Sequence, residues 1–204
     1  PGNPMFLMVS SSKSIRSRMF RDVLRGCVFD DYAWGYVAGA QGLEEALKAC
    51  FMARADWCPG PTQTINYASC HDNLSLFDRL TQSVPDAGFA ERVRMNNLAA
   101  AIYLLSQGVP FMQAGEEMLR SKPLPDGGFA SNSYCSPDAV NAIKWNHLRN
   151  PQYAAAADYY RGLIAFRKAH PTLRLTTREA VREQVHAIEG LEKKNVFLKQ
   201  KQRH

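Results

Sequence analysis

Residues 64–73 have the types and spacing that suit chemistry at the end of a β-strand. The stretch opens with β-branched and aromatic residues, narrows to small ones, and ends in His71, Asp72 and Asn73. An imidazole, a carboxylate and an amide together can donate hydrogen bonds, accept them and carry charge. Enzymes of the α/β class present such groups where strands end, so this triplet is a candidate site. A plain polar turn is the alternative, and the triplet alone leaves both open.

The elements around this stretch predict a βαβ unit. Apolar residues at helical spacing predict a helix over 89–107, which Gly108 would end. The apolar residues 109–115 predict a short, fully buried strand that again ends in charge, at Glu116 and Glu117. A strand, a helix and a second strand, with each strand ending in polar residues, predict parallel pairing.

Further elements are predicted on both sides of this unit from helix propensity and from glycine and proline breaks. The expected helices cover 15–26, 43–53, 74–80 and 153–170. Strands are expected at 5–9 and 195–198. Residues 122–138 form a long polar loop, and a loop of this length in a compact α/β unit favours a functional role.

Two surface features have more than one interpretation. In the helix predicted over 15–26, Arg18, Arg21 and Arg25 share one face, for which we favour solvation over function. Aromatic residues are frequent in 28–42. Such rings either stack on sugars or anchor a buried loop, and we favour the anchor.

Composition narrows the class of protein. With 204 residues, 46% hydrophobic and 22% charged, the chain predicts one globular domain. No apolar run approaches the ~20 residues that span a bilayer. The net charge is +6, but the basic residues do not form a face with aromatic residues between them, which disfavours nucleic-acid binding. The 5 cysteines are odd in number and lack CxxC spacing, which argues against a disulfide framework or zinc knuckle and favours a reducing compartment.

Five ordered segments resemble the type I pullulanases, starch-debranching members of the α-amylase superfamily (glycoside hydrolase family 13). These segments are 20–26, 63–80, 104–117, 132–138 and 167–171. The second holds the superfamily's His-Asp motif at His71 and Asp72. That motif alone is weak evidence, whereas five motifs in the right order are strong.

The resemblance implies an α/β fold, the C-terminal portion of a (β/α)8 TIM barrel with parallel strands. About three βα units would be present, whereas a full barrel takes about 250 residues. Residues 1–180 would then be a partial catalytic barrel. Residues 181–204 would be a truncated linker and the start of a C-terminal β domain. The chain begins with Pro1, so we expect a fragment or a processed chain.

The resemblance also implies retaining hydrolysis of α-1,6-glucosidic linkages in pullulan, starch or glycogen branches. Asp72 matches the carboxylate that stabilises the transition state. The substrate-binding positions are matched by His71, Asn73, Tyr134 and Asp138. A fixed carboxylate favours a cationic transition state over the neutral ground state. The family's nucleophile Asp and acid/base Glu match no residue here, so the chain alone is expected to be inactive.

The implied partner is an α-glucan, and no nucleic acid, membrane or obligate protein partner is expected. No cofactor or metal is expected, with calcium left open for a full-length parent. A cytoplasmic location is favoured over secretion. Two departures from the family concern substrate specificity: Ala142 replaces a basic residue of some relatives, and Cys135 stands where asparagine is usual.

Three alternatives stay open. The chain could come from another glucan hydrolase or transferase of the α-amylase superfamily, or it could be a non-catalytic glucan-binding piece. A metal-dependent phosphohydrolase with His71 and Asp72 as ligands is the third. It is disfavoured because metal sites need further ligands, and no other histidine has ligand spacing. The remaining histidines are His147, His170, His186 and His204.

Overall fold

The computed structural model describes residues 14–53 and 58–186. The helices are α1 (Ser14–Arg25), α2 (Glu44–Phe51), α3 (Leu76–Ser83), α4 (Phe89–Leu105), α5 (Asp138–Asn141), α6 (Pro151–Ala169) and α7 (Arg178–Gln184). The strands are β1 (Ile65–Asn66) and β2 (Val109–Pro110). Short 3₁₀ turns occupy Tyr36–Ala38, Pro61–Gln63, Glu116–Met118, Ser133–Cys135, Trp145–Arg149 and Pro171–Arg174. The strands predicted at 5–9 and 195–198 lie outside the described residues. In the described ranges, no helix has the length and apolar character needed to cross a membrane.

The two strands pair in parallel, with Ile65 opposite Val109 and Asn66 opposite Pro110. The chain between them forms α3 and α4, so the predicted βαβ unit is confirmed. The predicted helices around it are confirmed as well, with ends that differ by a few residues. The domain boundary predicted at residue 180 falls inside α7 and stays a prediction.

The second strand is not buried, and the prediction of a fully buried strand is wrong. Val109 is 46% and Phe111 37% exposed, and β2 pairs only with β1 in the part of the chain described. The N–H groups of Val109 and Phe111 donate to the carbonyls of Thr64 (2.9 Å) and Asn66 (2.8 Å). Backbone groups of alternate residues point to opposite edges, so Pro110 faces the free edge, and it has no N–H.

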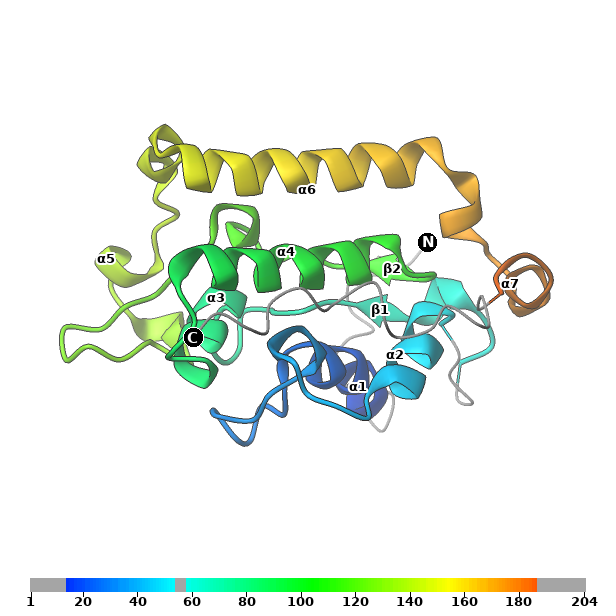
Figure 1. Ribbon diagram of the computed structural model, residues 1–204, viewed down its shortest axis with the longest axis horizontal. Coiled ribbons are helices and arrows are strands. Elements are labelled where there is room, and N and C mark those ends of the chain that lie inside the picture. Colours follow the sequence, from blue (N-terminus) through cyan, green and yellow to red (C-terminus); the bar gives the residue numbers. More distant parts are fainter. Residues whose placement is uncertain (1–13, 54–57, 187–204) are drawn as a thin grey trace, which may run out of the picture.

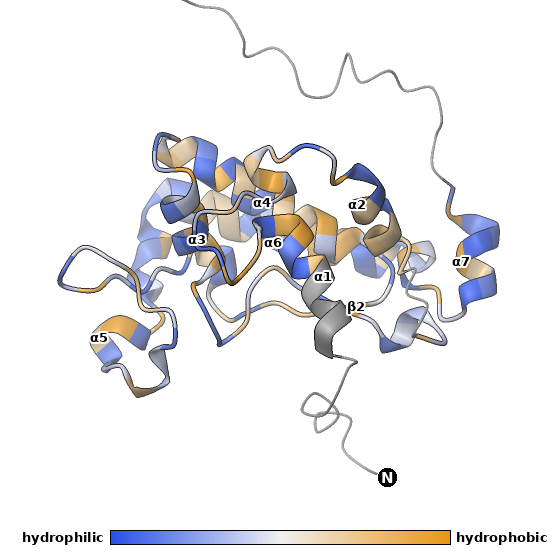
Figure 2. Cartoon of the chain, turned by 90° about the horizontal axis from the view of Figure 1, so that it is seen from below, coloured by the Kyte–Doolittle hydropathy of each residue, from blue (hydrophilic) through white to orange (hydrophobic). Residues whose placement is uncertain are grey.

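One apolar core joins α1, α3, α4 and α6. Its buried members are Phe20, Leu24, Val37, Ala68, Leu76, Leu80, Ala99, Ala100, Tyr103, Leu104 and Tyr160. Figure 1 shows α6 lying alongside α4, and β1 running between α4 and α1. Figure 2 shows hydrophobic residues gathered around α4 and α6, which pack against each other. Burial of these residues supplies the main driving force for holding the helices around the short sheet.

The C-terminal end of α4 is fixed by Arg167 of α6. Its Nη1 donates to the carbonyls of Leu104 (2.8 Å) and Ser106 (2.7 Å), and its Nη2 donates to that of Gly108 (2.7 Å). Carbonyls at a helix end lack partners within the helix, so this guanidinium satisfies them. Gly108 has a φ of +103°, a conformation that suits glycine, and it follows the helix as predicted.

The predicted solvation of the arginines on α1 is wrong for two of the three. Arg21 is 5% and Arg25 2% exposed, whereas the side chain of Arg18 lies outside the described part. The Nη1 of Arg25 donates to the carbonyl of Leu74 (2.7 Å), and the Nε of Arg21 binds Asp22 (2.8 Å). Burial, followed by the charge of Arg21, lowers the pKa of Arg25 to about 10.

We expect Arg167→Gln to destabilise the fold by about 2–4 kcal/mol, because buried carbonyls lose a charged donor. Urea unfolding measures the loss. Arg161→Gln is the control on the same helix, since Arg161 pairs with Asp158 at the surface. Such exposed pairs are worth ~0–1 kcal/mol. Equal losses in the two variants would contradict the role given to Arg167.

Candidate functional site

The triplet His71, Asp72 and Asn73 follows the extended segment after β1. The side chains of His71 and Asp72 are 87% and 64% exposed, and His71 Nε2 lies 3.4 Å from Asp72 Oδ1. The carboxylate is therefore not buried in a salt bridge. A ligand in solution can reach both the imidazole and the carboxylate.

Asn73 joins this triplet to the long loop 122–138. Its φ of +64° lies in the left-handed region, which asparagine tolerates better than most residues. Its N–H donates to Asn132 Oδ1 (3.3 Å), and its carbonyl accepts from Lys122 Nζ (3.5 Å). The same ammonium donates to Ser133 Oγ (3.0 Å). Lys122 thus holds the two loops together.

The long loop carries the remaining predicted residues, Tyr134 and Asp138. Tyr134 is 89% exposed, and Asp138 is exposed at the start of α5. The Nδ2 of Asn141 donates to the carbonyls of Ser133 and Ser136, the latter at 3.1 Å, and so keeps the loop closed. The loop of Tyr134 therefore meets the loop of the triplet, whereas no hydrogen bond or ion pair in the described ranges joins Asp138 to the triplet.

The buried carboxylate of Glu116 binds the chain segment that leads to the triplet. Glu116 is 3% exposed, and its Oε2 accepts from Ser69 Oγ at 2.6 Å. Its Oε1 accepts from the hydroxyls of Tyr103 (2.8 Å) and Tyr160 (3.1 Å). Burial raises the pKa of this carboxyl, and the three hydroxyl donors oppose that shift. The network ties the segment before His71 to α4 and α6.

A second buried carboxylate, Asp78 of α3, fixes the start of the long loop. It accepts from the backbone N–H of Lys122 (2.8 Å) and from the hydroxyl of Ser121. Burial raises the pKa of Asp78, and these hydrogen bonds oppose the shift. Burial, followed by the charge of Arg120, lowers the pKa of Lys122. Neither Asp78 nor Lys122 was predicted from the sequence as a site residue.

The aromatic loop after α1 projects its rings into solvent. Phe29 and Tyr32 are 84% and 69% exposed, so the favoured interpretation as buried anchors is wrong for these two. Trp34 is 53% exposed, but its Nε1 donates to the carbonyl of Ser83 (2.7 Å) and anchors the loop to α3. The buried Arg79 of α3 also holds the loop. It donates to the carbonyls of Cys27 (3.0 Å), Asp30 (2.5 Å) and Ala33 (2.9 Å) and to the carboxylate of Asp31 (3.2 Å).

In the described part of the chain, the other histidines do not gather around the triplet. His170 ends α6, and its Nδ1 lies 2.7 Å from the carbonyl of Phe166, as a cap would. The ring of His147 packs against Tyr153, with centroids 4.8 Å apart. Within residues 14–53 and 58–186, no group of three or more His, Cys, Asp or Glu side chains could hold a metal ion.

Comparison with known proteins gives a consistent set of relatives, although no family model matches the chain. The pullulanase of Bacillus subtilis (strain 168) is 32% identical over 176 residues, which cover 83% of this chain and 24% of that protein. The solved pullulanase from Bacillus acidopullulyticus has 37% identity and a TM-score of 0.75, over 81% of this chain and 20% of that one. A pullulanase from Paenibacillus barengoltzii, solved in complex with maltohexaose and α-cyclodextrin, has 37% identity and a TM-score of 0.75, over 81% and 26%. The chain spans about a quarter of the length of these relatives.

The raised pKa of Glu116 predicts how stability depends on pH. Above the ordinary carboxyl pKa of 4.5, the folded chain keeps a proton that the unfolded chain has released. The free energy of unfolding should therefore fall as the pH rises from 4.5 through the raised pKa. Glu116→Gln should remove this contribution and flatten the profile obtained by denaturant unfolding at a series of pH values.

The exposed Glu45 supplies the control, since Glu45→Gln should leave the profile unchanged. Asp78 adds a slope of the same sign, which both variants keep. If the Glu116→Gln profile kept the full slope, this carboxyl would have the same pKa in the folded and unfolded chains.

We expect Arg79→Lys to loosen the aromatic loop, because an ammonium cannot reach the four acceptors that the planar guanidinium binds. Amide hydrogen exchange in residues 27–34 should accelerate by about tenfold, equivalent to ~1.4 kcal/mol, while exchange in α4 stays constant. Arg94→Lys, at an exposed position of α4, is the matched control. Unchanged exchange in the loop would contradict the clamp.

Proposed function

This chain belongs to the pullulanase family, and we propose that it is part of a retaining glycoside hydrolase that cleaves α-1,6-glucosidic linkages in pullulan, starch or glycogen branches. The observation that carries this proposal is the meeting of two loops. Lys122 binds both the carbonyl of Asn73 and the hydroxyl of Ser133, so the exposed triplet lies beside the loop of the exposed Tyr134.

Within this proposal, β1 and β2 are consecutive strands of a (β/α)8 barrel, and the chain supplies about three of its βα units. The parallel pairing and the unpaired second edge of β2 support this, because a barrel strand has a neighbour on each edge. Residues 1–180 would belong to the catalytic barrel and 181–204 to the connection with a C-terminal β domain.

Asp72 is proposed to stabilise the transition state. An oxocarbenium-like centre gains positive charge that the bound sugar lacks, so a nearby carboxylate lowers the barrier to reaction. The exposure of Asp72 supports this role, since a sugar ring can approach its oxygens. His71, with its Nε2 3.4 Å away, would orient the carboxylate or bind a sugar hydroxyl.

The other predicted residues are proposed to bind the glucan. Sugar hydroxyls both donate and accept, which suits the amide of Asn73 and the carboxylate of Asp138. The ring of Tyr134, almost fully exposed, offers a flat apolar face for a glucose ring. The loop around it is held by Asn141, so the ring is presented from an ordered backbone.

The covalent chemistry is proposed to need groups from polypeptide outside these residues. A retaining mechanism uses a nucleophile and an acid/base carboxyl. The buried carboxylates Glu116 and Asp78 are already bound by hydroxyl and backbone donors inside the fold, which argues against either role. The chain should therefore bind glucan without hydrolysing it.

The test is a titration of the 204-residue chain with maltotetraose, a ligand of a solved relative, together with a reducing-sugar assay on pullulan. We expect weak saturable binding and no hydrolysis. Tyr134→Ala should weaken binding by about five- to tenfold, since an aromatic contact is worth ~1 kcal/mol or more. Tyr159→Ala, at an exposed position of α6, should leave it unchanged.

Two results would contradict the proposal. Equal affinities for maltotetraose in the Tyr134→Ala and Tyr159→Ala variants would show that the glucan does not bind at the loop of Tyr134. Pullulan hydrolysis by the chain itself, abolished in Asp72→Ala, would show that the nucleophile and the acid/base lie within these residues.

A further inference from the structure

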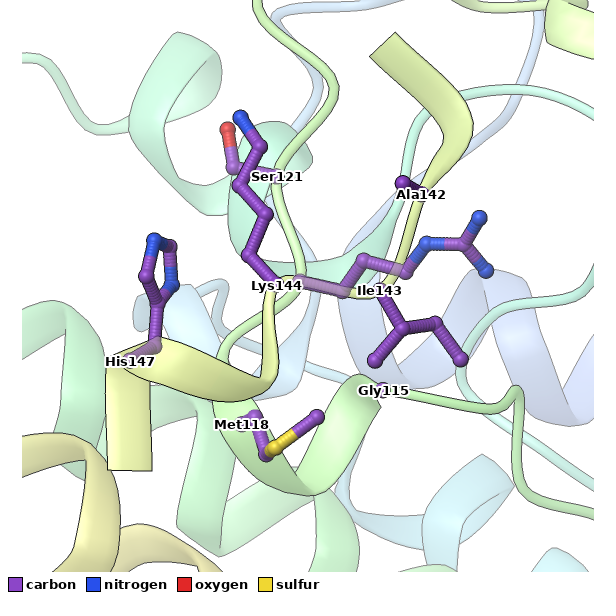
Figure 3. A pocket seen from close by; sticks show the side chains of 8 residues that line it. Gly115, Met118, Ser121, Ala142, Ile143, Lys144 and His147 are labelled. Atoms are coloured by element: carbon purple, nitrogen blue, oxygen red, sulfur yellow. The ribbon is translucent and has the colours of Figure 1, made fainter. Parts of the chain in front are cut away.

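A small hollow lined by cationic side chains lies beside the candidate site. It is formed between residues 115–121 and 142–147, and Figure 3 shows its lining. The polar side chains are those of Arg120, Ser121, Lys144 and His147, and no lining residue is acidic. None of the five predicted site residues lines this hollow.

The positive charge in this hollow has no carboxylate counter-ion. Arg120 donates only to neutral carbonyls, from Nη1 to Ala114 (3.1 Å) and from Nη2 to Asn141 (2.6 Å). Its Nε is buried without a hydrogen-bond acceptor. In the ranges that the structure describes, neither Arg120 nor Lys144 forms an ion pair. An uncompensated guanidinium and ammonium favour the binding of an anion.

Two carboxylates, Glu117 and Asp78, accept hydrogen bonds from residues of the lining. Glu117 accepts from the N–H of Gly115 (3.0 Å), and Asp78 accepts from Ser121 and from the N–H of Lys122 (2.8 Å). Both therefore act as hydrogen-bond acceptors for the loop backbone and hydroxyl. They are not paired with the ammonium of Lys144.

Two of the lining residues, Ile143 and Lys144, also carry backbone N–H groups that lack a partner in the described part of the chain. In Figure 3 the side chain of Lys144 extends toward Ser121, and His147 lies on the other side of Lys144 from Ala142. Free N–H groups next to cationic side chains are typical of oxyanion sites.

The free space in the hollow is about 240 Å³, part of which is open to solvent. An anion bound there would stay partly in contact with water. The negative charge of a tetrahedral oxyanion complements the arginine and the lysine.

We propose that this hollow binds a phosphate group, either as inorganic phosphate or as a monoester on a sugar. The site would touch the candidate glucan site through one residue. Asn141 accepts from Arg120 with its carbonyl, while its Nδ2 donates to Ser133 and Ser136 in the loop of Tyr134. Only the sugar-linked form of the ligand rests on the proposed function, because it requires a glucan in the neighbouring loop.

The experiment titrates the 204-residue chain with inorganic phosphate and follows the backbone amides by NMR. We expect saturable shifts at Ile143 and Lys144, and Lys144→Ala should weaken the affinity by about tenfold or more, as for loss of a charged donor. Lys168→Ala, an exposed lysine on α6, should leave the affinity unchanged. Lys144 is chosen over Arg120 because Arg120 also binds two loop carbonyls.

Absence of saturable shifts at these amides, or equal affinities in the two lysine variants, would overturn the proposal. A parallel titration with glucose 6-phosphate identifies the source of the phosphate. Tighter binding than inorganic phosphate supports a sugar-linked ligand, and weaker binding supports the free ion. Phosphate binding that persists when maltotetraose does not bind would separate failure of the proposed function from failure of this inference.

Discussion

The buried carboxylate of Glu116 is the interaction on which the arrangement of this chain depends. A buried carboxylate is costly unless its oxygens accept hydrogen bonds. Three hydroxyls supply them, from Ser69 after β1, Tyr103 on α4 and Tyr160 on α6. Asn96 extends the network by donating to Tyr160 at 3.0 Å. Because all three elements meet at one group, none can shift without leaving that group unsatisfied.

The position of the candidate site depends on this arrangement, because the exposed side chains of the triplet are attached to backbone that buried hydrogen bonds hold in place. Ser69 is held three positions before Asp72, so the triplet emerges at a fixed point. Lys122 and Asp78 then fix the long loop against that point. The triplet and Tyr134 can present their side chains to a ligand because buried hydrogen bonds hold their backbone in place, which precise binding geometry requires.

The sequence was informative where structure depends on neighbours along the chain. Helical periodicity and Gly108 located α4, and the strand-helix-strand order indicated the parallel pair. Burial of Arg25 was missed because its acceptor, Leu74, is 49 positions away. The exposure of β2 was missed because burial of a strand depends on what covers it. In the candidate site, the triplet was predicted from its residue types and stays a prediction, whereas Lys122 lies in a loop without periodicity.

Pro110 leaves the free edge of the small sheet with a backbone acceptor but no backbone donor. A strand that came alongside β2 would find a carbonyl there but no N–H, so one of its own carbonyls would lose its partner. Continuous ladders of the amyloid type require a donor at every step, and this residue interrupts them.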